Sequence, residues 1–120
     1  MDPRRTTGDR GEDLAATYLT DRGWTVLARN WRCVHGEIDL VLRDPDGAAV
    51  VCEVKTRNGS GWGSPLEAIT RTKALRLRRL AAAWARAQGA PVDDLRVDAV
   101  GITWHADGTA AIEHVRGIEP

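Results

Sequence analysis

Two apolar runs joined by a short turn constrain the fold of this chain most strongly; they occupy residues 35–57, HGEIDLVLRDPDGAAVVCEVKTR. Both runs are rich in Val, Leu and Ile, as expected of core strands. The turn between them, DPDG, places Pro and Gly where a three-residue hairpin loop needs a right-handed and a left-handed residue. The sequence therefore predicts an antiparallel hairpin in which Asp44 lies opposite Ala48.

Polar side chains interrupt both strands of this predicted hairpin. In the register set by the turn, Asp39 lies opposite Glu53, and Glu37 lies opposite Lys55. Side chains alternate across a strand, so these four groups share one face of the sheet. The apolar residues of the first strand are predicted on the other face: Ile38, Leu40 and Leu42.

Clustered carboxylates repel one another unless something neutralises them, and a divalent cation does so directly. Oxygen ligands without a Cys/His cluster favour Mg²⁺ or Mn²⁺. Lys55 is placed to hold a water molecule or to stabilise charge in phosphoryl transfer. The alternative is a surface charge ladder in which Glu37 and Lys55 form a weak ion pair. Four groups in register on otherwise apolar strands favour the functional interpretation.

Composition indicates one globular domain over residues 1–120, with residues 1–8 as a flexible tail. No apolar run reaches the length of a membrane span, and the N-terminal residues lack a signal-peptide pattern. Two cysteines form neither a disulfide framework nor a zinc motif. We therefore expect a cytoplasmic protein that does not contact membranes.

Charge is unevenly distributed along a chain whose net charge is zero. Residues 50–90 carry a net +6, whereas residues 1–49 and 91–120 carry −2 and −4. A basic middle third indicates either a phosphate-facing surface or a solvated helix face. The candidate nucleic-acid-binding residues are Arg57, Trp62, Arg71, Lys73, Arg76 and Arg79. Trp62 is placed to stack on a base or to pack against a second subunit.

The remaining periodicity predicts an α/β or α+β domain with a mixed central sheet and helices on its faces. The expected helices cover residues 9–22 and the stretch from a capping box at Ser64 to Gly89, with a fresh start near residues 70–72. The expected strands cover residues 24–32, 36–43, 48–57, 95–104 and 109–118.

Asp39 followed by Glu53-Val54-Lys55 resembles the PD-(D/E)xK signature of the restriction-endonuclease-like superfamily, with Ile38 in place of the proline. The segments NWRCVHGEIDLV, VVCEVKTR, GSPLEAI and LRVDAV resemble the YraN family of uncharacterised endonuclease-like proteins, from about residue 11 to residue 100. The resemblance implies a restriction-endonuclease-like fold. It also implies that Asp39 and Glu53 bind Mg²⁺ or Mn²⁺ with the Val54 carbonyl, and that Lys55 is the catalytic lysine.

Five further residues have two interpretations each. Glu12 matches an acid that related Holliday-junction resolvases point at the metal, or it is an exposed helix-start glutamate. Glu37 binds a second metal or orients Lys55. Arg57 contacts phosphate or flanks its strand. Lys73, predicted on a face with apolar residues, reaches the site or a phosphate, or snorkels at the helix edge. Asp98 belongs to the family pattern and is expected to pair with Arg96 or another neighbour.

These observations together predict a metal-dependent nuclease that hydrolyses DNA phosphodiester bonds, with branched or recombining DNA among its candidate substrates. One alternative is a non-catalytic nucleic-acid-binding or protein-interaction module with a vestigial site. A second alternative is a Holliday-junction resolvase, which requires a homodimer for symmetric cutting.

Overall fold

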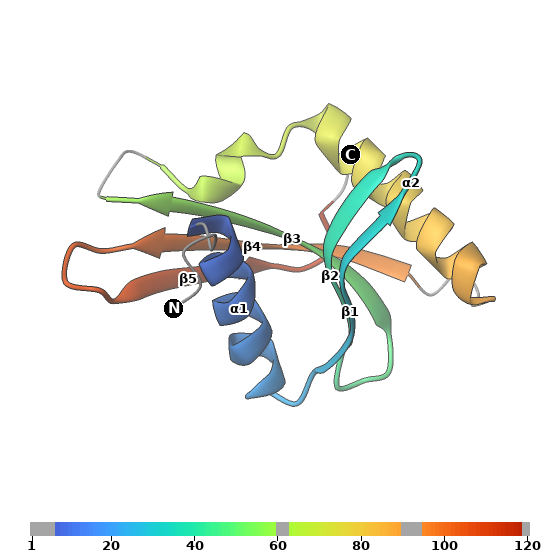
Figure 1. The fold of residues 1–120 in the computed structure, drawn as a ribbon, viewed down its shortest axis with the longest axis horizontal. Helices are drawn as coiled ribbons and strands as arrows, with labels where there is room; N and C mark the ends of the chain where they lie inside the picture. Colours follow the sequence, from blue (N-terminus) through green and yellow to red (C-terminus); the bar gives the residue numbers. More distant parts are fainter. Residues whose placement is uncertain (1–6, 60–62, 90–94, 119–120) are drawn as a thin grey trace.

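The computed structural model describes residues 7–59, 63–89 and 95–118 (Figure 1). In chain order the elements are α1 (Thr7–Thr20), β1 (Thr25–Cys33), β2 (Gly36–Arg43), β3 (Ala49–Asn58), the 3₁₀ helix η1 (Pro65–Ala68), α2 (Arg71–Gln88), β4 (Leu95–Trp104) and β5 (Ala110–Val115). This order agrees with the sequence prediction. α1 begins two residues earlier than expected, inside the predicted tail. Residues 1–6 and Trp62 lie outside the described residues. Within the described residues, no helix is long and apolar enough to cross a membrane.

The five strands form one mixed sheet in the order β1-β2-β3-β4-β5. β3 and β4 run parallel, while the other neighbouring pairs are antiparallel. A parallel pair needs a crossover connection, which η1 and α2 provide here. The predicted α/β architecture with a mixed central sheet is confirmed, and β3 occupies the middle of that sheet.

Each face of the sheet carries one apolar core. On one face α1 packs against a cluster that includes Leu19, Leu40, Val50, Val100 and Ile102. On the other face α2 packs against a cluster that includes Val41, Val51, Leu77, Leu80 and Trp84. Burying a side chain of this size contributes about 1.5–3 kcal/mol relative to leaving it exposed. The sheet is therefore held rigidly between two helices, and polar groups in its middle have fixed positions.

The β2–β3 turn forms as its sequence predicts. The Asp44 N–H donates to the Ala48 carbonyl at 2.9 Å, and Gly47 takes a left-handed φ of 96°. The Asp44 carboxylate accepts from the backbone N–H groups of Asp46 and Ala48, both at 2.9 Å. The ladder then runs from Arg43 opposite Ala49 to Leu40 opposite Cys52. The predicted three-residue loop is confirmed, and its register is confirmed as far as Leu40 and Cys52, where the ladder ends.

The simple alternation expected for β2 is wrong at Asp39. Leu40 and Leu42 share the α1 side of the sheet, as predicted, but Ile38 packs on the α2 side. The change of side coincides with an irregularity in β1, where Asn30 has a φ of 50°. Asn30 and Asp39 are both missing from the β1–β2 register, which also shifts between Val26 and Ala28. The alternation of side chains along β2 is therefore interrupted at Asp39, the residue that was predicted to bind metal.

The predicted long helix divides into two pieces. Ser64 caps η1 and accepts from the Leu66 N–H at 3.0 Å, while Thr70 caps α2 and accepts from the Lys73 N–H at 3.2 Å. The new start changes the phase, so the buried stripe of α2 passes through Ala74 and Leu77. Lys73 is exposed rather than on the apolar face, which corrects the prediction for this residue.

A charged network joins the N-terminal end of β4 to the β2–β3 turn, to β5 and to the residues after β5. We call this network the charge clamp. Its members are Asp44, Arg96, Asp98 and His114. Arg96 donates to both carboxylate oxygens of Asp98, at 2.8 and 3.1 Å, and to Asp44 at 2.9 Å. His114 Nε2 and the Gly117 N–H contact the same Asp98 carboxylate at 2.9 and 3.0 Å. The predicted pairing of Asp98 with Arg96 is confirmed.

Candidate active site

Asp39 lies where β2 and β3 separate, because the ladder joining them ends one residue earlier, at Leu40 and Cys52. Its Oδ2 atom accepts a hydrogen bond of 2.8 Å from the backbone N–H of Val54. The carboxyl group of Glu53 lies within hydrogen-bonding reach of the Asp39 carboxyl group and raises its pKa. The two side chains therefore lie close together, although the β2–β3 ladder does not extend to them.

Glu12 reaches the same place from α1. A Cβ on the preceding residue, Gly11, would overlap the Thr56 side chain, so this glycine lets α1 approach β3 closely. Glu12 hydrogen-bonds to Asp39, and its Oε2 accepts from Asn30 Nδ2 at 3.0 Å. Of the two interpretations of Glu12, the structure favours the one in which it points at the site. We call Glu12, Asp39 and Glu53 the acidic site.

The acidic site holds protons at neutral pH. Burial raises the pKa of Glu12 to about 7, with the neighbouring Asp39 adding to the effect and the Asn30 hydrogen bond opposing it. Burial and the hydrogen bond with Glu53 raise the pKa of Asp39 to about 7, against the opposing Val54 N–H. A hydrogen bond between two carboxyl groups needs a shared proton. A cation entering this space therefore replaces protons that the acids would otherwise retain.

Lys55 stands beside the acidic site on the same strand as Glu53. Its Nζ atom lies 3.8 Å from Glu53 Oε1, and the Lys55 side chain is 33% exposed. Val51 packs under α2, so alternation along β3 places Glu53 and Lys55 on that same side of the sheet. The ammonium group is thus close enough to act on a substrate held by the carboxyl groups.

Glu37 has other partners than the sequence predicts. The β2–β3 ladder stops before reaching it, so the expected pairing with Lys55 does not form within that ladder. Instead Glu37 accepts from Arg32 Nε and from Asn30 Nδ2, both at 2.9 Å. Asn30 thereby connects Glu37 to Glu12, and Glu37 borders the acidic site through this amide.

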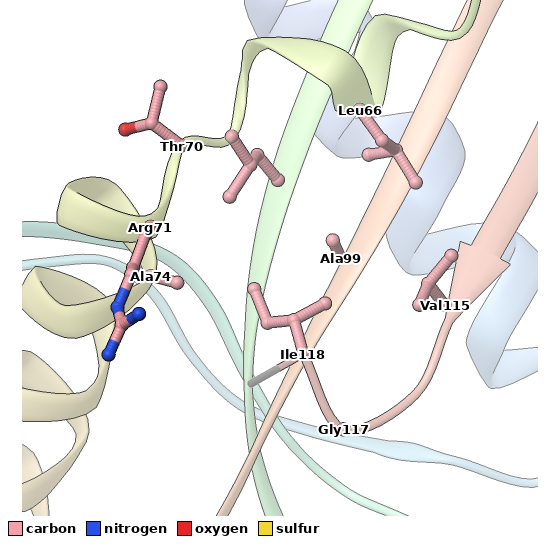
Figure 2. Close-up of a pocket in the computed structure, with 9 residues that line it drawn as sticks. Leu66, Thr70, Arg71, Ala74, Ala99, Val115, Gly117 and Ile118 are labelled. Atoms are coloured by element: carbon pink, nitrogen blue, oxygen red, sulfur yellow. The ribbon is translucent and has the colours of Figure 1, made fainter. Parts of the chain in front are cut away.

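A recess of about 540 Å³ opens between the start of α2, β4 and the end of β5 (Figure 2). Its floor includes Ala99, which is the register partner of Glu53 on β4. Apolar side chains form most of its wall: Leu66, Ile69, Ala74, Val115 and Ile118. Thr70 and Arg71, at the start of α2, stand at its left edge in Figure 2. The recess therefore adjoins β3 through the register partner of Glu53, and none of the described residues that line it is acidic.

The predicted nucleic-acid-binding residues occupy different positions around this site. Arg57 lies two residues beyond Lys55 and is half-buried, while four residues of α2 are exposed: Arg71, Lys73, Arg76 and Arg79. Arg71 borders the recess, whereas Arg76 and Arg79 lie further along the helix. The structure thus places Arg71 at the recess and spreads the other basic side chains along α2.

The donor set fits a hard divalent cation. Asp39 and Glu53 offer carboxyl oxygens from two strands, and their hydrogen bond shows that both reach the same space. Across the described residues, no group of three or more His, Cys, Asp or Glu side chains forms a complete metal-binding cluster. Mg²⁺ normally keeps several water ligands and binds one or two carboxylates together with a substrate phosphate, so two carboxylates suffice for it.

Asn30 is the site residue that the sequence analysis missed. Its amide bridges Glu12 and Glu37, and its φ of 50° marks the backbone irregularity opposite Asp39. A signal was present, since Asn is depleted in strands and is among the residues that tolerate a left-handed φ. The Asn in the predicted strand WTVLARNWR therefore indicated a local break.

A mixed five-stranded sheet with a helix on each face, and with acids gathered where β2 and β3 separate, defines an α/β protein. The chain belongs to the uncharacterised protein family UPF0102, the YraN family, whose family model matches residues 11–102. The resemblance drawn from the GEID and EVKTR segments is thereby confirmed.

Relatives cover nearly the whole chain. A UPF0102 protein of Nocardioides sp. is 51% identical over 96% of this chain and 92% of its own length. One from Streptomyces coelicolor is 50% identical over 98% and 92%. Among solved structures, an EndoMS–dsDNA complex matches 80% of this chain and 36% of its own, with 22% identity and a TM-score of 0.44. Pyrococcus furiosus SfsA with Ca²⁺ covers 93% and 63%, with 12% identity and a TM-score of 0.41.

Proposed function

We propose that this protein is a metal-dependent nuclease that hydrolyses phosphodiester bonds of DNA. The observation that carries the proposal is the acidic site, where three carboxyl groups from α1, β2 and β3 meet in hydrogen-bonding contact beside Lys55. Retaining protons near pH 7 is costly for acids with no chemical task, and perturbed groups of this kind concentrate at functional sites. A divalent cation and a phosphate together meet the needs of this arrangement.

Each residue has a role in this proposal. Asp39 and Glu53 hold Mg²⁺ or Mn²⁺, with the Val54 carbonyl as a further donor. When bound, the cation supplies Lewis-acid chemistry at the phosphate. The Lys55 ammonium stabilises the negative charge that develops on the phosphoryl oxygens, which is a preorganised electrostatic contribution. Glu12 accepts a proton or orients the attacking water by hydrogen bonding.

DNA approaches, in this proposal, from the side of the sheet that carries α2. Glu53 and Lys55 face that side, and the exposed Arg71 and Lys73 stand at the start of the helix there. Each phosphate that they contact releases counterions, so affinity should fall with salt by roughly 0.9 log units per log unit of salt for each contact. Arg57 belongs to the same proposed surface, and Trp62, outside the described residues, stays a sequence-based candidate.

The test combines cleavage with metal binding. The protein is incubated in Mn²⁺ or Mg²⁺ with linear, nicked, flapped and four-way DNA, and cation binding is measured separately by calorimetry. We expect cleavage that EDTA abolishes and that Asp39→Asn and Lys55→Ala remove. Asp46→Asn, in the exposed β2–β3 turn, is the matched control and should cut normally. Cation binding no tighter to the parent than to Asp39→Asn, together with no cleavage, would identify a vestigial site instead.

A further inference from the structure

A second hollow lies away from the acidic site, where the tip of the β1–β2 hairpin meets the outer side of α2 (Figure 1). Its volume is about 460 Å³, and it is lined by His35, Arg76, Arg79, Ala82 and Arg86. A Cβ on Gly36 would come within 3.7 Å of a Leu80 methyl group, so the hairpin tip rests directly on the helix. We call this feature the arginine hollow.

Its arginines differ from most others in the chain. Arg29, Arg32 and Arg96 each form a salt bridge with an acid. Arg76, Arg79 and Arg86 are exposed and, among the described residues, have no hydrogen-bonding or ionic partner. The chain has as many acidic residues as basic ones, so a shortage of acids does not explain why these three arginines lack an acidic partner. Like charges placed together repel, and they attract an anion strongly.

The shape of the arginine hollow favours a long anion over a small one. Arg76 and Arg86 are ten residues apart on α2, or about 15 Å along the helix axis, so one phosphate cannot contact both. Ala82 lies between them and leaves the floor open. Guanidinium groups match phosphate oxygens through paired hydrogen bonds. A strand of duplex DNA offers successive phosphates about 3.4 Å apart along its axis, and this suits such a row.

A membrane surface does not suit the same row. The apolar residues of α2 pack onto the sheet: Ala74, Leu77, Leu80, Ala81, Trp84 and Ala85. A helix that binds in a bilayer interface needs such a face free for the acyl chains. Among the described residues, the exposed side of α2 carries mainly basic side chains, with Leu75 as its one exposed large apolar residue. A polyanion that makes mainly polar contacts suits this surface better than acyl chains do.

We propose that the arginine hollow binds backbone phosphates of a nucleic acid at a distance from the cleavage centre. This inference rests on the proposed function. His35 lies in the β1–β2 turn, four residues before Asp39. This is about 13 Å of extended chain, which corresponds to roughly four base-pair steps of duplex. The hollow therefore holds the flank of a substrate whose reacting phosphate lies at the acidic site, and it adds His35 and Arg86 to the predicted binding residues.

The test measures DNA binding in EDTA, by fluorescence anisotropy of a duplex over a range of salt concentrations. In Arg79→Gln/Arg86→Gln we expect the slope of log K against log salt to flatten by about 1.8, from two lost contacts. This corresponds to an affinity lower by roughly 60-fold at 0.1 M salt, if 1 M is the reference. Arg22→Gln/Arg116→Gln removes the same charge on the α1 side and should leave the slope near that of the parent.

A second variant blocks the hollow without removing an arginine. Ala82→Glu places an acid among the guanidinium groups, whereas Ala87→Glu adds the same charge on an exposed part of the helix outside the hollow. We expect Ala82→Glu alone to weaken DNA binding, by about tenfold. Equal effects of the two glutamates, or of the two arginine pairs, would overturn the proposal, because binding would then depend on net charge alone.

Two further measurements separate other partners and other failures. The parent and Arg79→Gln/Arg86→Gln are titrated with phosphatidylserine vesicles and with a polyglutamate peptide. Loss of either interaction with DNA binding unchanged would overturn the proposal and assign the hollow to that partner. Since all of these measurements exclude divalent cations, a protein that binds here but never cuts DNA would refute the nuclease proposal and support this one.

Discussion

The acidic site and the charge clamp both place aspartates inside one sheet, and they satisfy them in opposite ways. At the clamp, Asp98 accepts from Arg96, His114 and the Gly117 N–H. At the acidic site, Asp39 shares hydrogen bonds with the carboxyl groups of Glu12 and Glu53, and Val54 is its N–H donor. One group is surrounded by donors, while the other is surrounded mainly by further acids.

This difference sets the direction of each pKa. Burial favours the neutral form at both places and is the largest influence at each. At the clamp, hydrogen bonds from His114 and Arg96 outweigh it and hold the pKa of Asp98 below its ordinary value. At the acidic site, Glu53 adds to the effect of burial, and the pKa of Asp39 rises to about 7. The clamp pairs its carboxylates within the chain, whereas the acidic site is the place where we propose that a cation binds.

The largest expected effect comes from breaking the clamp. Asp98→Asn removes the negative charge that Arg96 and His114 share, and breaking a buried charged pair costs about 3–5 kcal/mol. We expect the free energy of unfolding, measured with urea at pH 7, to fall by that amount. Asp46→Asn in the exposed turn is the control and should unfold like the parent. A similar small change in both variants would mean that the clamp does not hold the fold.

Asp39→Asn tests the other side of the comparison. It keeps the size of the side chain but removes a proposed metal ligand. Loss of residues that merely support ligands costs 10–100-fold in activity, so we expect cleavage to fall by roughly 100-fold or more. The urea midpoint in EDTA at pH 8 should rise, because repulsion among the acids is relieved. A variant that cuts like the parent would place the activity elsewhere.

The pH dependence of stability sharpens the comparison further. The pKa values of Glu12 and Asp39 are about 7, against ordinary values of 4.5 and 3.8. Between about pH 4 and 7 the folded chain therefore binds more protons than the unfolded chain, and stability falls as pH rises. Asp44 and Asp98 have lowered pKa values, so their contributions to the stability of the fold are lost only when the pH falls into the acidic range.

We count one extra proton for the neighbouring pair Glu12 and Asp39, because Glu12 is partly exposed to solvent. At about 1.4 kcal/mol per pH unit, we expect this proton to lower the free energy of unfolding in EDTA by about 2–3 kcal/mol between pH 5 and pH 8. Mn²⁺ at pH 8 should restore it, since a ligand that binds the folded chain stabilises it. Asp39→Asn should flatten the dependence, which separates it from histidine titration. Equal slopes in parent and variant would exclude the acidic site as the cause.

The smallest effect concerns Asn30. Its Nδ2 hydrogen bond lowers the pKa of Glu12, so Asn30→Gly should raise that pKa, by less than about one pH unit or 1.4 kcal/mol. Glycine is the suitable replacement because it accepts the φ of 50° without strain. Carboxyl ¹³C NMR titration measures the change. An unchanged pKa would show that Asn30 matters only for the left-handed backbone conformation and not for the charge of Glu12.

How far the sequence predicts this site depends on how local its causes are. The register of Asp39 and Glu53 follows from the DPDG turn, whose residues choose their own conformation. The break in side-chain alternation at Asp39 coincides with a left-handed residue, Asn30, in the neighbouring strand. The periodicity of the sequence does not encode such a residue. Lys73 was misplaced because the apolar period was continued across the helix break at Thr70.

Longer-range packing was out of reach in the same way. Nothing near His35 in the sequence indicates that the hairpin tip rests on α2 beside Arg79, since forty or so residues separate them. By contrast, the pairing of Asp98 with Arg96 was predictable because side chains two residues apart on a strand share a face. Sequence patterns thus supplied the pairs within and between adjacent strands, and tertiary packing supplied the rest.

The short β2–β3 turn also has a consequence for the order of folding. A three-residue loop closes in microseconds, long before the β3–β4 pair, which must await α2. Asp39 and Glu53 are therefore drawn together early, while their surroundings are still wet and incomplete. We expect part of their mutual repulsion to slow the refolding limb rather than to speed unfolding, so that mild acid accelerates the formation of this protein as well as stabilising it.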